Sequence, residues 1–230
     1  MPFDALVVFA KMPKAGKVKS RLGAAIGPDR AALLYGLFLR YLSWRLQKLP
    51  LGLQLFIAVD PPGASRRILR YFPYFSGPQV FPQRGKDLGA RMLNATRAAQ
   101  RRGARKVLII GSDCLEISVA HLKRGLELLD RKDLVLGKAR DGGYYLLGWK
   151  RPAPVCFRGV VWSTAQVLDR TVSNAEKGGL SAGFLPVLSD VDEVKDLRRL
   201  GRRLDPRNPI TRFLRRACPD AFTLRRRPSK

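Results

Sequence analysis

Short apolar runs alternate with stretches of helical periodicity from one end of the chain to the other. KVLIIG, at residues 106–111, is the clearest apolar run and has the composition of a buried strand. Strands that alternate with helices in this way are typical of a largely parallel sheet covered by helices. The pattern therefore predicts an α/β fold, and a hydrophobic content of 46% in 230 residues suffices for a substantial core.

The expected elements fill most of the chain. Predicted strands cover residues 5–10, 53–59, 79–81, 106–111, 133–137, 144–149 and 184–188. Predicted helices cover residues 28–49, 65–72, 87–102, 118–130 and 163–177, and a last helix begins at Asp192. Pro28 suits the first turn of its helix, and Asp87 suits a cap position. We expect a single α/β domain over residues 1–204 and a basic C-terminal extension over residues 205–230.

Positive charge is the most unusual property of the composition. The formal net charge is +26, and arginine is crowded into the segment from Lys195 onward. Such a charge attracts polyanions, acidic membrane surfaces and phosphorylated metabolites without choosing among them. We do not expect specific nucleic-acid binding, because charge alone supplies only the nonspecific part of that affinity. An anionic membrane surface is a candidate partner for the basic C-terminus.

The cysteines and the hydropathy of the chain indicate in which cellular compartment the protein would be found. Cys114, Cys156 and Cys218 form no CxxC pair, so the sequence suggests neither a disulfide framework nor a zinc site. The first ten residues lack the basic start of a signal peptide, and no apolar segment approaches the roughly 18 residues of a membrane span. We expect a cytoplasmic protein, with peripheral attachment to a membrane as the alternative.

A cationic loop follows the first predicted strand. The stretch ALVVFAKMPKAGKVKSRLG, residues 5–23, passes from an apolar run directly into four lysines and an arginine. It differs from the common ATPase phosphate loop, because Lys11 replaces the first glycine and Val18 replaces the metal-binding Ser or Thr. A ligand beyond the carboxyl ends of parallel strands would still meet this loop. The residues that we expect to contact phosphates here are Ala10, Lys11, Gly16, Lys19 and Arg21.

Aspartates follow several of the other predicted strands. Asp60 follows the second strand, Asp113 the fourth and Asp141 the fifth, and the last strand is followed by Asp190 and Asp192. Carboxylates supply the hard oxygen ligands that Mg²⁺ and Mn²⁺ prefer. A cationic loop that faces several aspartates therefore predicts a phosphorylated nucleotide bound through a divalent ion.

Six short motifs are more specific as an ordered set than any one of them alone. In chain order they are FAKMPKAGKVKSRL, DLGARM at 87–92, GSDC at 111–114, DGGYYLLG at 141–148, WST at 162–164 and DVD at 190–192. The set resembles bacterial glycosyltransferase-like proteins of the nucleotide-diphospho-sugar transferase superfamily, the group that includes arsenosugar-biosynthesis-type glycosyltransferases. The Lys-x-Arg-Leu loop and the Asp-Gly-Gly segment are more distantly similar to phospholactate guanylyltransferase. The Arg-rich tail lies outside the resemblance.

The resemblance implies a GT-A type fold that binds a nucleotide diphosphate or triphosphate. Asp113 would hold the ion that bridges the pyrophosphate, and Asp190 or Asp192 would complete the metal site. Asp141 would orient or deprotonate the acceptor. The residues expected on the acceptor side are Gly142, Gly143 and Trp162. Further contacts to the nucleotide or its phosphates are expected from Asp60, Gly89 and Arg91.

Several of these residues also have plain structural interpretations. Asp-Gly-Gly at 141–143 is typical of a hairpin turn, and Asp192 suits the N-cap of the helix that follows it. Asp60 lies in a Pro-flanked turn, and Trp162 has the size and apolarity of a core residue. We expect His121 on a helix surface, because nothing near it in sequence makes a triad.

Three functions are consistent with the sequence. The leading hypothesis is a glycosyltransferase that depends on Mg²⁺ or Mn²⁺ and moves a sugar from a nucleotide-diphospho-sugar donor to an unknown acceptor. A second is a nucleotidyltransferase that joins a nucleoside triphosphate to a phosphorylated small molecule and releases pyrophosphate. A third, from outside the enzymes, is a noncatalytic polyanion- or membrane-binding protein.

Overall fold

A computed structural model of the protein describes residues 3–205 and 207–217. The strands are β1 (Phe3–Lys11), β2 (Leu53–Asp60), β3 (Gln79–Pro82), β4 (Ala104–Gly111), β5 (Leu134–Ala139), β6 (Tyr144–Trp149) and β7 (Ala182–Leu188). They form one seven-stranded sheet in the order β3-β2-β1-β4-β6-β5-β7. β6 runs antiparallel to β4 and β5, and the other pairings are parallel. The predicted α/β fold with a mostly parallel sheet is confirmed.

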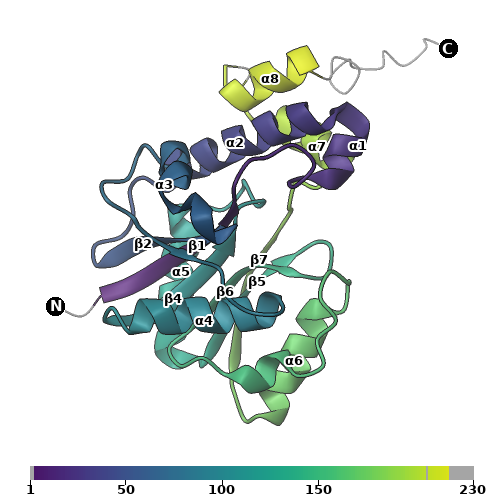
Figure 1. The fold of residues 1–230 in the computed structure, drawn as a ribbon. Helices are drawn as coiled ribbons and strands as arrows, with labels where there is room; N and C mark the ends of the chain where they lie inside the picture. Colours follow the sequence, from purple (N-terminus) through teal and green to yellow (C-terminus); the bar gives the residue numbers. More distant parts are fainter. Residues whose placement is uncertain (1–2, 206, 218–230) are drawn as a thin grey trace.

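Helices cover both faces of this sheet, with α2 and α8 above it and α4 and α6 below it in Figure 1. The helices are α1 (Ser20–Ile26), α2 (Pro28–Arg45), α3 (Ser65–Ile68), α4 (Leu88–Gln100), α5 (Val119–Arg131), α6 (Val167–Lys177), α7 (Val194–Arg203) and α8 (Pro209–Ala217). Side chains alternate along a strand. Leu6 and Val8 of β1 therefore join the core under α1, α2, α5 and α7, whereas Ala5 and Val7 join the core under α4 and α6.

The main differences from the sequence-based expectation lie at helix starts. α1 was not expected, and its N-cap is Lys19, a residue type that gives no capping signal. The expectation that Asp192 caps the last predicted helix is wrong: Glu193 is the N-cap of α7 and forms a capping box with Asp196. Asp87 caps α4 as predicted, accepting a hydrogen bond from the backbone N of Ala90 at 2.8 Å.

His121 lies on α5 as expected, but its side chain is only partly exposed. Its ring belongs to the capping box of α5, where the backbone N of Ser118 donates to Nδ1 at 3.2 Å. The ring also packs edge-on against Tyr145, with the centroids 6.3 Å apart. The residue therefore helps to cap α5 and contacts the sheet.

The helix α8 lies in the segment expected as a basic extension. Ile210 and Thr211 are buried there, and the helix packs against α2 and α7. The domain boundary at residue 204 stays a prediction, and residues 206 and 218–230 of the expected extension lie outside the described residues. In the part of the chain that the structure describes, no helix is long and apolar enough to cross a membrane.

Candidate nucleotide-binding site

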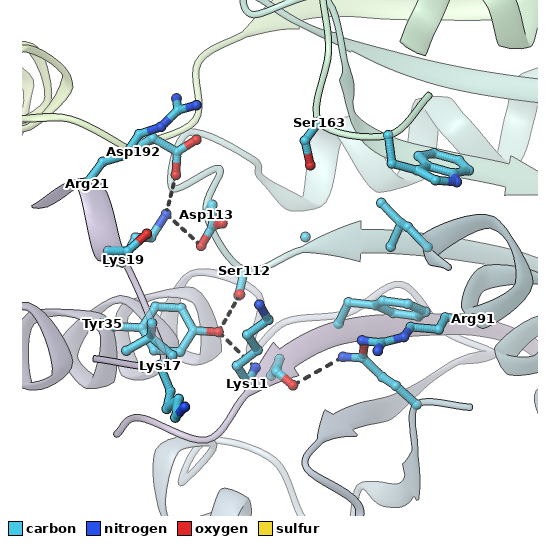
Figure 2. Close-up of a pocket in the computed structure, with 18 of the residues that line it drawn as sticks. Lys11, Lys17, Lys19, Arg21, Tyr35, Arg91, Ser112, Asp113, Ser163 and Asp192 are labelled. Atoms are coloured by element: carbon cyan, nitrogen blue, oxygen red, sulfur yellow. Dashed lines mark hydrogen bonds and ion pairs between the residues drawn. The ribbon is translucent and has the colours of Figure 1, made fainter. Parts of the chain in front are cut away.

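A pocket of about 800 Å³ opens at the edge of the sheet where the parallel strands end (Figure 2). It lies between the loops that follow β1, β4 and β7 on one side and the start of α4 and the segment before α6 on the other. The predicted site residues that line it are Ala10, Lys11, Gly16, Lys19, Arg21, Arg91, Asp113, Trp162 and Asp192. Groups from distant parts of the sequence thus border one space, as expected for the carboxyl edge of an open α/β sheet.

Lys19 lies at the centre of the charged contacts in this pocket. Its Nζ donates hydrogen bonds to the backbone O of Val191 at 2.7 Å and to Oδ1 of Asp192 at 2.8 Å, and forms an ion pair with Oδ1 of Asp113 at 2.9 Å. The Lys19 side chain is 4% exposed. Burial alone lowers its pKa, but the charges of Asp113 and Asp192 outweigh burial and hold the pKa above its usual range. The ammonium is therefore a permanent cation between the loops after β4 and β7.

The other cations predicted to bind phosphates are more exposed. Lys11 and Arg21 line the same pocket and are exposed, as is Lys17, which was not among the predicted phosphate contacts. Nη1 of Arg21 reaches Oε1 of Glu193 at 3.7 Å, and the arginine side chain is 70% exposed. The structure thus directs Lys19 to carboxylates and leaves Lys11, Lys17 and Arg21 exposed on the lining of the pocket.

Tyr35 and Ser112 form a buried link that the sequence did not single out. The hydroxyl of Tyr35, on α2, accepts a hydrogen bond from the backbone N of Lys11 at 3.0 Å and lies 2.7 Å from Oγ of Ser112. Burial, and secondarily the charge of Asp113, raises the pKa of Tyr35 well above its usual range, so the hydroxyl keeps its proton. It joins the ends of β1 and β4. The sequence offered no signal for this contact, because Tyr35 lies among the apolar positions of a long helix.

Asp190 is the most perturbed carboxyl group of the cluster. Its Oδ1 is buried and finds no hydrogen-bond partner among the described residues. Burial, followed by the charges of Asp113, Asp141 and Asp192, raises the pKa of Asp190 to about 7. Asp190 does not line the pocket, whereas Asp192 does. The two aspartates expected to serve one metal site therefore have different surroundings.

The Asp-Gly-Gly segment forms the turn between β5 and β6. Oδ1 of Asp141 accepts a hydrogen bond from the backbone N of Gly143 at 3.0 Å, and the backbone N of Ala139 donates to the carbonyl of Gly143 at 3.0 Å. Gly142 has a φ of +87°, and a Cβ there would lie 2.1 Å from the carbonyl oxygen of Ala165. The glycine is needed for this close approach. Asp141, Gly142 and Gly143 do not line the pocket, so their expected roles toward the acceptor stay predictions.

Arg91 and Trp162 line the opposite end of the pocket, and Asp60 and Gly89 lie next to them. Nη1 of Arg91 is 3.8 Å from Oδ2 of Asp60, and each side chain is 34% exposed. A Cβ on Gly89 would lie 2.7 Å from the Trp162 ring, which explains the glycine by packing. Trp162 packs edge-on against Phe157 at 5.5 Å and also borders the pocket, so it has both a packing contact and a lining position. Asp60 and Gly89 do not line the pocket.

Backbone conformation sets two pocket residues apart. Among the described residues, Lys19 and Ser163 are the non-glycine residues with positive φ, at 49° and 66°. Both line the pocket. This region of backbone space is sparsely populated by L-residues, and such positions cluster at functional sites. Sequence reasoning missed Ser163, because nothing in the WST motif indicates a left-handed conformation.

The carboxylates fit a divalent ion in their chemistry. Within the described ranges, no group of three or more His, Cys, Asp or Glu side chains is arranged to hold a metal ion. Mg²⁺ is nevertheless commonly bound by one or two carboxylates together with phosphate oxygens of a substrate. Asp113 and Asp192 already share one cation, the ammonium of Lys19. This pair is therefore able to hold a cation between two loops.

Comparison with solved structures gives the class of the chain. A proposed nucleotide-diphospho-sugar transferase from Desulfovibrio desulfuricans is 32% identical over 94% of this chain and 95% of that protein, with a TM-score of 0.83. CMP:2-keto-3-deoxy-manno-octonic acid synthetase in complex with CTP is 11% identical over 87% of this chain and all of that one, with a TM-score of 0.52. A cytidylyltransferase from Leptospira borgpetersenii is 13% identical over 96% of both chains, with a TM-score of 0.51. The last two likenesses support the fold alone.

The fold, the pocket and the first of these comparisons define a transferase with the nucleotide-diphospho-sugar transferase fold. A family model described as "Uncharacterized protein conserved in bacteria (DUF2064)" matches residues 47–164. The chain belongs to this family. Among curated proteins no match was found. The resemblance inferred from the six motifs is confirmed at the level of superfamily and fold.

Proposed function

We propose that this chain is a metal-dependent glycosyltransferase that uses a nucleotide-diphospho-sugar donor. The observation that carries the proposal is the convergence of the cationic loop after β1 with Asp113 and Asp192 on one pocket at the carboxyl edge of the sheet. Cations and carboxylates together are what a diphosphate and its divalent ion require. The 32% identity to the proposed transferase from Desulfovibrio desulfuricans supports the same class of donor.

The side chains around the diphosphate would act mainly through charge. In the transfer step, a nucleophilic atom of the acceptor forms a bond to the anomeric carbon, and the bond from that carbon to the phosphate oxygen breaks. The nucleoside diphosphate leaves with the bonding electron pair. Lys11 and Arg21, which line the pocket, would stabilise the negative charge that grows on this leaving group. Gly16, with a φ of +71°, would let backbone approach the phosphates.

The proposed cofactor is Mg²⁺ or Mn²⁺. Asp113 and Asp192 would hold the ion, and Asp190 is the third candidate ligand because its buried Oδ1 lacks a hydrogen-bond partner among the described residues. When bound, the ion would supply further positive charge to the diphosphate. Asp141 is the residue proposed to accept the proton of the acceptor; it does not line the pocket, but its charge acts on Asp190.

A nucleotidyltransferase is the second candidate function, and the supply of positive charge favours it. Lys11, Lys17, Arg21 and Arg91 line the pocket in addition to Lys19. That is enough positive charge to oppose the phosphates of a triphosphate. In this reaction a phosphate oxygen of the second substrate forms a bond to the α-phosphorus, the α–β phosphoanhydride bond breaks, and pyrophosphate leaves.

One experiment separates the two reactions. The protein is incubated with Mn²⁺ and radiolabelled UDP- or GDP-sugars, or with free nucleoside triphosphates. Release of a nucleoside diphosphate from a sugar donor would support the glycosyltransferase. Pyrophosphate release from a triphosphate, with no turnover of any sugar donor, would contradict it. Thermal-shift screening of nucleotides with Mn²⁺ identifies the base first, because ligands that bind only the folded state raise its apparent stability.

Partner and location follow the same proposal. The expected small-molecule partners are a nucleotide sugar or a nucleoside triphosphate and an acceptor. The basic C-terminal region, from Lys195 onward, is proposed to contact an anionic membrane surface from the cytoplasmic side. Specific nucleic-acid binding is not expected.

A further inference from the structure

Lys19 is bound like a ligand within its own protein. An ammonium group carries three protons, and Nζ of Lys19 has three oxygen contacts, to Val191, Asp192 and Asp113, at 2.7, 2.8 and 2.9 Å. The Lys19 side chain is 4% exposed, whereas the side chains of Asp113 and Asp192 are 40% and 43% exposed, so the ammonium is buried while its carboxylate partners stay open to the pocket. The contacts to Val191 and Asp192 are hydrogen bonds, and the contact to Asp113 is an ion pair, so the ammonium is already engaged by groups of its own protein.

The same two carboxylates are those that the proposed function gives to a divalent ion. Figure 2 shows the Lys19 side chain pointing toward Asp113 and Asp192, which come from the loops after β4 and β7. A second cation in contact with these carboxylate oxygens would lie only a few ångströms from the ammonium. Repulsion between them is strong where water does not screen it. The ammonium and a divalent ion therefore exclude each other at this place.

The surroundings of Lys19 also favour an exchange. Asp113 and Asp192 contact Lys19 directly, and nearby Asp190 keeps a buried Oδ1 without a hydrogen-bond partner among the described residues. A divalent ion brings more positive charge to such a cluster than an ammonium does. Lys19 borders the pocket, so phosphates of a bound nucleotide are an alternative partner for its side chain. Its left-handed backbone, with φ at 49°, is a sparsely populated conformation.

We propose that Lys19 is an internal cation that occupies the divalent-metal position between Asp113 and Asp192 and gives it up when an anionic nucleotide binds. Metal and nucleotide then bind with positive coupling, since the phosphates attract Lys19 and free the carboxylates. This coupling rests on the proposed function for the identity of the anion, but the exclusion of metal by Lys19 does not. In the alternative arrangement, the metal would bind without nucleotide and without displacing Lys19, and the affinity of Lys19→Met for Mn²⁺ distinguishes the two.

The test measures Mn²⁺ binding by the electron paramagnetic resonance signal of free Mn²⁺, first without any nucleotide. Lys19→Met removes the charge and keeps the length of the side chain. Lys17→Met is the matched control, because it removes one positive charge from the same loop and pocket. We expect Lys19→Met to bind Mn²⁺ about tenfold tighter than the wild type, and Lys17→Met to change the affinity by about twofold at most. Equal Mn²⁺ affinities of Lys19→Met and Lys17→Met would overturn the proposal.

A second arm adds UDP, GDP or CTP. In the wild type, the nucleotide that binds should tighten Mn²⁺ binding by about tenfold, which is within the usual range of coupling between two ligands. In Lys19→Met this coupling should shrink to about twofold, because no ammonium has to leave. Undiminished coupling in Lys19→Met would count against the exchange. If none of the nucleotides binds the wild type, the proposed function fails, while the comparison without nucleotide still judges the role of Lys19.

Lys19→Met leaves two carboxylates close together and could fail to fold without metal. The wild type then provides the readout through acylation of lysines followed by mass spectrometry. Saturating Mn²⁺ alone should increase the labelling of Lys19 several-fold, because the displaced ammonium becomes reachable. Lys17, already exposed, should be labelled equally with and without Mn²⁺. Protection of Lys19 that persists when Mn²⁺ is bound would contradict the proposal.

Discussion

The two ends of the pocket, one next to Asp113 and the other next to Arg91, differ in the burial and the length of their charged contacts. At one end, Lys19 makes three contacts of 2.9 Å or less and is 4% exposed. At the other end, Arg91 and Asp60 lie 3.8 Å apart, and each is 34% exposed. Buried charged groups in short contact hold a fixed geometry, whereas exposed ion pairs contribute little to stability and move easily. The difference indicates that, before a ligand binds, Lys19 holds the end next to Asp113 in one arrangement, whereas the end next to Arg91 is only loosely held.

The largest effect that tests the difference between the two ends of the pocket is expected at Asp113. Asp113→Asn keeps the shape of the side chain and removes its charge, so it should lower the rate of transfer by about a hundredfold to a thousandfold if the geometry of this end matters for the reaction. Nucleotide affinity should fall mainly when Mn²⁺ is present. Single-turnover kinetics and thermal shift with and without Mn²⁺ measure both effects. Asp130→Asn, which removes an exposed ion-pair partner of Lys106, is the control and should change the rate by less than about twofold. An unchanged rate in Asp113→Asn would remove this residue from the site.

The next largest effect concerns the pH dependence of stability in metal-free protein. The folded protein raises the pKa of Asp190 from 3.8 to about 7, mainly through burial. The native state then binds a proton that the unfolded chain releases, so stability should fall as pH rises from about 4 to about 7 and level off above it. Asp190→Asn removes this dependence. Each unit of pKa difference corresponds to about 1.4 kcal/mol, so the variant should gain up to about 4 kcal/mol relative to the wild type between pH 4 and 8.

Urea unfolding of wild type and Asp190→Asn in EDTA, over this pH range, gives the difference directly. Other titrating groups are common to both proteins and cancel in the comparison. A constant difference in unfolding free energy across the range would show that Asp190 titrates normally, and the cluster around Lys19 would then be less tightly coupled than the geometry indicates.

The hydrogen bonds of Tyr35 between the ends of β1 and β4 test how much the end of the pocket next to Asp113 contributes to stability. Tyr35→Phe removes the hydroxyl that accepts from the backbone N of Lys11 and contacts Ser112. Leaving these groups unpaired should lower the free energy of unfolding by about 1 to 3 kcal/mol. Tyr41→Phe is the control on the same helix, since Tyr41 packs through its ring against Trp44. A loss in Tyr35→Phe no larger than in the control would show that the link contributes nothing.

The smallest effect is expected at the open end. Arg91→Gln removes the partly exposed ion pair with Asp60, whose ends are 3.8 Å apart, which should change stability by less than about 1 kcal/mol. Nucleotide affinity should fall by less than about tenfold, because solvent and salt screen the attraction of a partly exposed charge. Isothermal titration at two salt concentrations measures it. An effect as large as that of Asp113→Asn would mean that the two ends are equally fixed.

The fold was accessible from the sequence because strands and helices have local signals. The run at residues 106–111 and the period of α2 depend only on which side chains are apolar, and the structure places elements there. The position of several aspartates after strand ends followed from the same reasoning.

Partners inside the site were less accessible, because side-chain pairing depends on three-dimensional packing. The sequence placed Lys19 among phosphate ligands by its neighbours in the chain, whereas its contacts come from Asp113 and from residues 191 and 192. Tyr35 and Ser163 gave no sequence signal, since one is part of a helix pattern and the other differs only in backbone conformation. The predicted start of α7 differs from the observed one because glutamate rarely caps helices. Asp192, a preferred capping residue type, was therefore predicted in place of Glu193.

The packing of α8 decides how the arginine-rich end can be studied. A chain shortened at residue 204 would lose the buried Ile210 along with the arginines and would uncover part of α2. Weaker attachment to heparin or to phosphatidylserine vesicles in such a protein could come from a damaged domain as easily as from missing charge. Ending the chain after residue 217 instead keeps the helix and still deletes Arg225, Arg226 and Arg227. This shorter truncation removes positive charge but keeps the packed helix, so a loss of membrane or heparin binding could be assigned to the charge.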